Sequence, residues 1–151
     1  IYNGETVKIS SGYVVGGNGS AADIVGVLNG IFFNAADTNK PTFSNFYKAT
    51  ITPANSEDTT AFVMDDPFQQ YVVSTDDART QAQFLATYDM NSSAGDDTTG
   101  KSSSTLDTSV TDANGKQFRL LRSAEDPDNE DITAAFFSAI VVSNTNSFNQ
   151  V

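Results

Sequence analysis

Closely spaced carboxylates are the side chains of this sequence best suited to chemistry. They occur at Asp65-Asp66, at Asp76-Asp77, at Asp96-Asp97 and between Asp126 and Asp131. Two carboxyl groups facing each other across a cleft are the catalytic equipment of most glycosidases. A glycosidase or peptidoglycan-degrading domain using Asp65 or Asp66 is therefore one hypothesis. The chain has no Trp to stack on a sugar ring, and adjacent Asp residues in so acidic a chain are ordinarily solvated turns. We expect no catalysis at these pairs.

Calcium binding needs only oxygen ligands and is the better hypothesis for the last cluster. Asp126, Asp128 and Glu130 stand at alternate positions, as at the start of an EF-hand loop. The pattern then fails, because the sixth position is Asp131 instead of Gly and the twelfth is Phe137 instead of Glu. A polar turn between strands is the favoured interpretation. A calcium-dependent adhesin remains the alternative.

The residue types that are missing exclude several classes of site. The sequence contains no Cys and no His, which excludes a thiol nucleophile, a disulfide framework, a Cys or His metal site and a Ser-His-Asp triad. We therefore expect a protein that is not an enzyme and needs no cofactor. A formal net charge of −11 disfavours nucleic acid as a partner. The longest apolar runs, at 31–33 and 134–142, are too short to cross a bilayer.

The first half of the chain reads as short strands. Residues 1–20 are polar and predict an extended N-terminal arm, although Val7, Ile9 and the segment 13–15 could instead pair as strands. Residues 24–33 combine Gly with many β-branched and aromatic residues, which favours a strand, and 43–47 should return as the second strand of a hairpin.

A strand is also expected at 60–64, where Asp65-Asp66-Pro67 would end it, with Asp65 making an Asx-turn. Extended chain should resume at 68–73. A helix of two or three turns should then start at Thr75 or Asp76 and end before Asn91.

Polar residues dominate 91–115 around a lone Leu106, which predicts a long loop. Strands follow at 117–120 and 136–142, and a polar tail at 144–151. The fold class expected is mainly β, a small β-barrel or sandwich with long loops and one short helix. The 151 residues fit an N-terminal arm at 1–20 and a single β-rich domain at 21–151.

Adjacent aromatic residues occur at 32–33 and at 136–137. Neighbouring side chains of a strand point to opposite faces, so one ring of each pair should lie outside the domain's own core. A helix, a loop or another subunit would have to cover it. This surplus of apolar strand face indicates oligomerisation.

Several segments in a set order carry a resemblance to a known family. They are 26–33 (GVLNGIFF), 39–47 (NKPTFSNFY), 61–67 (AFVMDDP), the Gly- and Ser-rich stretch from Gly100 to Asp107, and the FRLL strand, Pro-Asp-Asn turn and last strand between Phe118 and Asn144. Over residues 24–148 this order resembles virion proteins of tailed bacteriophages, marine and cyanobacterial ones included. Relatives often carry Trp near Tyr47 and His in the terminal tail, where this chain has Lys48 and Asn146.

The resemblance implies a capsid decoration, or cement, protein. Such proteins bind the outer surface of the capsid, commonly as trimers at local threefold positions, and resist the outward pressure of packaged DNA by bridging capsomers. The implied partner is the phage major capsid protein, together with two further copies in a homotrimer. The arm 1–20 and the tail 144–151 are the segments expected to reach neighbours. A phage fibre module is a further alternative, alongside the calcium-dependent adhesin.

Overall fold

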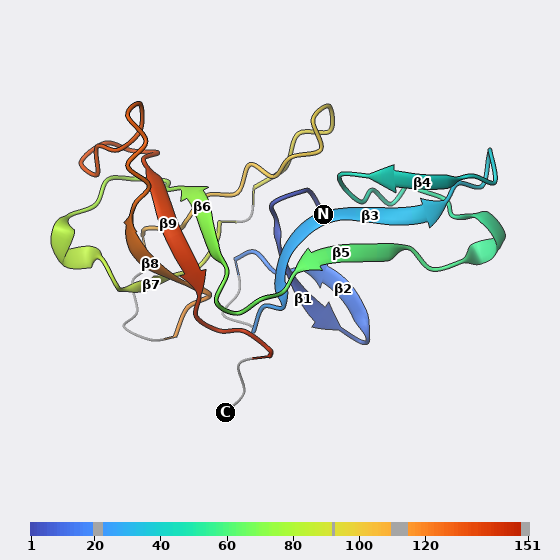
Figure 1. Ribbon diagram of the computed structural model, residues 1–151, viewed down its shortest axis with the longest axis horizontal. Helices are drawn as coiled ribbons and strands as arrows, with labels where there is room; N and C mark the ends of the chain where they lie inside the picture. The colour runs from blue at the N-terminus through green and yellow to red at the C-terminus, as the bar shows by residue number, and fades with distance from the viewer. Residues whose placement is uncertain (20–22, 92, 110–114, 149–151) are drawn as a thin grey trace.

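Two antiparallel sheets lie side by side along the long axis of the molecule (Figure 1). The computed structural model describes residues 1–19, 23–91, 93–109 and 115–148. The first sheet contains β1 (Thr6–Ser10), β2 (Tyr13–Gly16), β3 (Gly26–Asn34), β4 (Pro41–Ser44) and β5 (Thr60–Met64). The second has the order β6-β9-β8-β7 and contains β6 (Gln70–Ser74), β7 (Thr87–Tyr88), β8 (Phe118–Ser123) and β9 (Ser138–Ser143). The prediction of a mainly β fold is confirmed.

A barrel was one of the two architectures expected, and that prediction is wrong because both sheets are open. The strand β3 organises the first sheet. It pairs with β1 and β4 along one side and with β5 along the other. Figure 1 shows β3, β4 and β5 extending together away from the second sheet. Within the described residues this arrangement leaves β5 as an edge strand, paired only with β3.

The core has two parts, and β3 contributes buried side chains to both. One cluster fills the space at the second sheet and also takes in Ile24 and Val27 from the β3 region; its other buried members are Tyr88, Met90, Leu106, Phe118, Leu120, Phe137, Ala139 and Val141. The smaller cluster lies on one face of the first sheet and contains Val7, Leu28, Ile31 and Phe33. Burial of these side chains supplies the main driving force of folding.

The predicted helix after Thr75 is wrong. A single 3-10 turn, η2 (Gln81–Gln83), stands there, followed by β7. Leu85 adopts a φ of 67°, which ends any helical run, and Tyr88 is fully buried. Asp76, the expected N-cap, instead accepts hydrogen bonds from the backbone and hydroxyl of Thr108. Tertiary burial has overridden local helix preference. A second 3-10 turn, η1 (Ala54–Ser56), precedes β5.

Residues near the N-terminus belong to the first sheet. Of the two interpretations left open for residues 1–20, the paired strands are the one observed: β1 and β2 form a hairpin, and Val7 is fully buried. In the tail, Asn146 is buried and its amide donates to the Val25 carbonyl. The segments expected to reach neighbours are therefore held by the fold as far as residue 146.

The described part of the predicted loop 91–115 contributes a side chain to the core. Leu106 is completely buried and forms bridges with Thr75 and Met90. Its backbone N–H donates to the Ser74 carbonyl. A polar sequence around one leucine thus closes the second sheet's core instead of standing in solvent.

Candidate interaction surface

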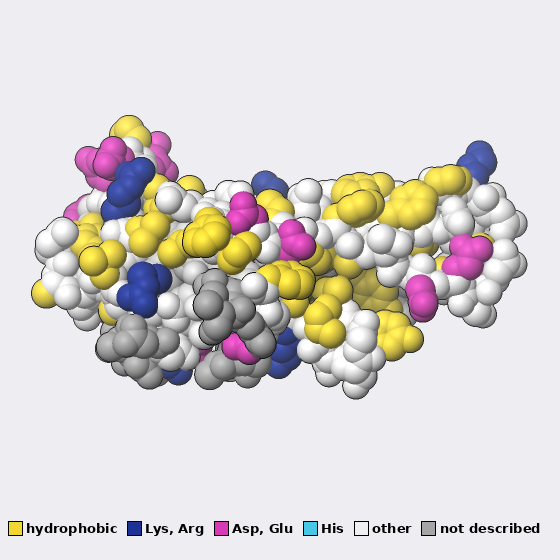
Figure 2. All heavy atoms as spheres, turned by 60° about the horizontal axis from the view of Figure 1, so that its bottom comes forward, with side chains coloured by type: hydrophobic (Ala, Val, Ile, Leu, Met, Phe, Trp, Pro, Cys, Tyr) yellow, Lys and Arg dark blue, Asp and Glu magenta, His cyan; other side chains and the backbone are white. Residues whose placement is uncertain are grey.

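An exposed aromatic surface covers one face of β3, β4 and β5. It consists of Phe32, Phe43, Phe62 and Met64, whose side chains are between 38% and 57% exposed. Phe32 and Phe43 are direct partners in the β3–β4 register, and the rings of Phe43 and Phe62 lie 6.0 Å apart between centroids. Figure 2 shows hydrophobic side chains gathered over the part of the molecule that holds these strands. We call these four residues the aromatic face.

A bulge in β3 creates this surface. The β3–β5 register shifts between Leu28 and Gly30, so Asn29 is the extra residue. Leu28, Ile31 and Phe33 then point to the small core, while Phe32 points to the other side. The prediction that Phe32 and Phe33 face opposite ways is confirmed. Phe136 and Phe137 precede β9 instead of starting the strand as predicted, although Phe136 is exposed and Phe137 is buried.

Gly30 sets the position of the central ring. Its φ is 138°, and a Cβ built on it would lie only 2.5 Å from Cζ of Phe43. The ring of Phe43 therefore rests directly on the backbone of β3. Only glycine allows this close approach, which holds the exposed ring against the sheet.

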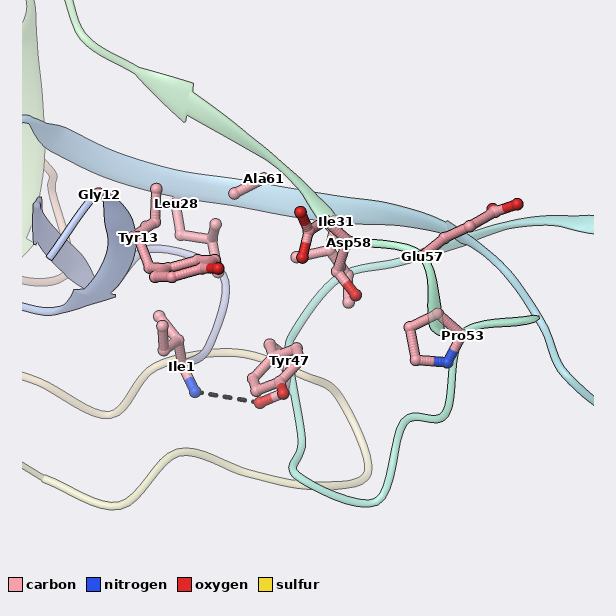
Figure 3. A pocket seen from close by; sticks show the side chains of 12 residues that line it. Ile1, Gly12, Tyr13, Leu28, Ile31, Tyr47, Pro53, Glu57, Asp58 and Ala61 are labelled. Atoms are coloured by element: carbon pink, nitrogen blue, oxygen red, sulfur yellow. Dashed lines mark hydrogen bonds between the residues drawn. The ribbon is translucent and has the colours of Figure 1, made fainter. Parts of the chain in front are cut away.

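The opposite face of β5 borders a groove of about 670 Å³ (Figure 3). Leu28, Ile31 and Ala61 from the sheet are among its apolar lining residues. Tyr13 lies beside Leu28 and Asp58 beside Ile31, with Glu57 and Pro53 beyond Asp58; Tyr47 also lines the groove. Ile1 also lines the groove and pairs with Tyr47 through backbone hydrogen bonds in both directions.

Acidic pairs stand at both ends of β5. Glu57-Asp58 precedes the strand and Asp65-Asp66 follows it. Glu57 accepts a hydrogen bond from the Asn34 amide. Partial burial, and then the negative charges of Asp66 and Asp65, raise the pKa of Tyr71, whose hydroxyl donates to the Met64 carbonyl at the end of β5. The sequence analysis did not single out Glu57-Asp58. Its position just before a predicted strand that is followed by Asp65-Asp66 could have identified it.

The four predicted acidic clusters are separate, and most of their carboxylates shape turns. Asp66, instead of the predicted Asp65, makes the Asx-turn by accepting from the Phe68 N–H at 2.9 Å. Asp76 lies at the start of the loop between β6 and β7. Its carboxylate accepts hydrogen bonds from Asn91 and Thr108 and so links this loop to the segment after β7. Partial burial acts to raise its pKa, but these hydrogen bonds lower it overall.

Asp96 and Asp97 belong to a small turn that contacts the N-terminal residues. Asp96 accepts from the Thr98 N–H at 2.8 Å and from the Thr99 hydroxyl at 3.0 Å, and these bonds lower its pKa. Asp97 pairs with Lys48 at 2.6 Å and accepts from the Tyr2 hydroxyl. Both carboxylates therefore have structural partners in or around this turn.

The calcium candidates are likewise not gathered into a site. Asp126 accepts from the backbone of Asp128, and Asp131 from the backbone and hydroxyl of Thr133. No group of three or more acidic side chains able to hold a metal ion occurs within residues 1–19, 23–91, 93–109 and 115–148. Asp126, Asp128 and Glu130 thus fit the polar turn better than a metal loop.

The side chain of Arg79 is buried beside the core cluster of the second sheet. Arg79 is 8% exposed, and its guanidinium lies 5.2 Å from the centroid of the Tyr88 ring. Its backbone N–H donates to Ile132 at 2.6 Å, which anchors the loop between β8 and β9. A cation over an aromatic face stabilises the packing here.

No protein-family model, curated protein or solved structure matches the chain. In the described part of the chain, no helix has the length and apolar character needed to cross a membrane. The surfaces of the β3–β5 lobe are therefore the strongest physical indication of what the molecule does.

Proposed function

We propose that this protein is a structural component of a tailed-phage virion that binds the outer surface of the capsid and reinforces it. The observation that carries the proposal is the aromatic face: three phenylalanines and a methionine, exposed side by side on a sheet. Contiguous exposed apolar surface marks interaction sites, and aromatic residues and Met are enriched at the centres of interfaces.

The chemistry of the remaining surface supports binding without catalysis. Carboxylates of three of the acidic clusters have structural partners: Asp66, Asp96 and Asp126 accept hydrogen bonds from the backbone of their own turns, and Asp97 pairs with Lys48. A protein that binds only the assembled shell stabilises that shell by mass action, and binding alone is therefore enough for the proposed role. The proposed partner is the phage major capsid protein, with three copies of this chain meeting at one site on the virion surface.

The aromatic face is the part expected to contact the shell or a neighbouring copy. Fully burying an exposed phenylalanine side chain contributes about 1.5 to 3 kcal/mol, and these rings, 38% to 57% exposed, would gain roughly half of that. Several such rings, repeated over every copy on the particle, would oppose expansion of the shell without any covalent bond.

The test uses heads of the phage that encodes the chain, made from a strain lacking its gene. Purified protein is added, and bound copies are measured by co-sedimentation, while DNA release is followed as the temperature rises. We expect saturable binding and a higher release temperature. The double variant Phe43→Ser, Phe62→Ser should bind at least tenfold more weakly. The matched control, Phe68→Ser with Phe136→Ser, removes two exposed rings outside the aromatic face and should bind normally. If the protein neither sediments with heads nor changes DNA release, the proposal fails.

A further inference from the structure

The outer edge of β5 carries backbone groups that no other strand of residues 1–19, 23–91, 93–109 and 115–148 pairs with. The N–H of Leu28 donates to Glu5 and its carbonyl accepts from Gly4, so both groups point toward β1. Leu28 is the register partner of Val63. In an antiparallel ladder, residues opposite each other either exchange both bonds or both point away. The N–H and C=O of Val63 therefore point away from β3, as do those of Ala61 two residues earlier.

An added strand at this edge would find an apolar environment on both faces. Its side chains would alternate between the groove below, at Leu28 and Ile31, and the aromatic face above, at Phe62 and Met64. In the described chain β3 is the sole strand paired with β5. Backbone hydrogen bonds supply affinity in this mode of recognition, and the alternate side-chain positions supply specificity.

Charge decides which strand fits. In the antiparallel register that lets Ala61 and Val63 exchange hydrogen bonds between two copies, the Glu57-Asp58 end of one copy would face the Asp65-Asp66 end of the other. Like charges directly opposite each other destabilise a sheet, and charged residues at strand ends are a known defence against edge pairing. Pairing of β5 with its own copy is therefore disfavoured. A strand with a cation at each end is favoured for the same reason.

We propose that the outer edge of β5 binds an extended segment of the partner protein, with alternating apolar residues flanked at both ends by Lys or Arg. Asp58 and Asp65 are seven positions apart, which is about 23 Å in a strand at roughly 3.3 Å per residue. The two basic ends of the segment should have the same separation. The identity of the partner as a capsid protein rests on the proposed function; the chemistry of the segment rests on β5 alone.

The experiment measures binding of a synthetic peptide to the full chain. The peptide alternates Thr and Val over five residues and carries two lysines at each end; its twin carries glutamates instead. Backbone amide shifts in NMR should be confined to β5, its two acidic ends and the groove for the lysine peptide. The glutamate peptide should bind at least tenfold more weakly.

Two protein variants separate the charges from the strand edge. The first replaces Glu57, Asp58, Asp65 and Asp66 by their amides, which keeps the Asn34 and Phe68 hydrogen bonds possible. It should bind the lysine peptide at least tenfold more weakly and should self-associate. The matched control changes Asp126, Asp128, Glu130 and Asp131 to amides, with the same change in net charge, and should bind normally. The second variant, Ala61→Pro, removes one outward N–H at an edge position where proline is tolerated, and should also weaken binding.

Equal binding of both peptides, equal loss in the control variant, or shifts away from β5 would overturn the inference. Should Ala61→Pro fail to fold, the charge variant and its control decide alone. The outcomes are distinct from those of the capsid assay. Attachment to heads without peptide binding would remove only the β5 inference, and peptide binding without attachment to heads would remove only the proposed function.

Discussion

The hydroxyl of Tyr2 donates a hydrogen bond of 2.8 Å to the carboxylate of Asp97, 95 positions along the chain. The Tyr2 ring stacks on Phe46 with 5.5 Å between centroids, and the ammonium group of Lys48 lies over Phe46 while pairing with the same carboxylate. Gly95 and Gly100 allow the two rings to approach the turn, since a Cβ at either would clash with them. This cluster fixes the 93–101 turn to the N-terminal residues.

The first prediction concerns acid stability of this cluster. The Lys48 side chain, and then the Tyr2 hydroxyl, hold the pKa of Asp97 below its usual range. A carboxyl whose pKa is lowered by folding stabilises the protein above its unfolded pKa of about 3.9, and this stability is lost as pH falls through the folded value. Asp97→Asn should therefore lower the melting temperature at pH 7, and the two curves should converge as pH falls through the lowered pKa of Asp97. Asp128→Asn, in an exposed turn, is the control. Parallel curves for wild type and Asp97→Asn would contradict the prediction.

The second prediction concerns Asp76, which holds the loop 91–108 to the second sheet. Asp76→Ala removes the acceptor of the Thr108 N–H and one of the two acceptors of the Asn91 amide, and should lower the free energy of unfolding by about 1 to 3 kcal/mol. Asp77→Ala removes a carboxylate whose one hydrogen bond among the described residues comes from the Ala78 N–H. Its effect should stay within about 0.5 kcal/mol. Urea unfolding of both variants measures the difference, and equal effects would show that Asp76 has no special role.

The third prediction concerns Leu106. It is fully buried although its sequence neighbours are almost all polar. Leu106→Ala should cost about 2 to 5 kcal/mol of stability through lost burial and the cavity left behind. Leu85→Ala, at a side chain that is 60% exposed, provides the matched control and should change stability little. A small effect at both positions in thermal unfolding would mean that the loop does not close the core.

The fourth prediction concerns assembly on the particle. The aromatic face leaves apolar surface that one copy does not cover, and we expect three copies to contact one another on the shell. Light scattering of the free protein, together with a reconstruction of decorated heads, measures the stoichiometry. Isolated copies without mutual contact on the shell would rule out the trimer.

The fifth prediction concerns Gly30. Gly30→Ala places a Cβ against the Phe43 ring at a backbone φ that side chains rarely adopt. We expect a lower melting temperature and displacement of Phe43, with weaker binding to heads. Gly12→Ala shares a positive φ but meets no atom within 4 Å, so it isolates the backbone strain from the displacement of the ring. Equal binding by the two variants would show that the position of Phe43 is unimportant.

Local pattern was enough to identify most of the strands, β7 excepted. Residues 60–64 alternate between half-buried and exposed positions and form β5 with the expected bounds, because a strand's side-chain period is a local property of the chain. The same period explains why Phe32 and Phe33 point to opposite faces. Absence of Cys and His from the sequence likewise excluded whole classes of catalytic site without any structure.

Long-range contacts decided the remainder. Tyr88 joins a strand, and no helix forms before it, because burial against Phe118 and its neighbours outweighs local propensity. Asp97 meets Lys48 and Tyr2 only through the folding of three distant segments. Whether β5 is central or at an edge depends on which strands pair with β3, and pairing between distant segments leaves no local trace in the sequence. The sequence by itself therefore determined a mainly β protein whose strands carry apolar side chains on both faces. Only the tertiary structure decided which of those faces and edges remain uncovered.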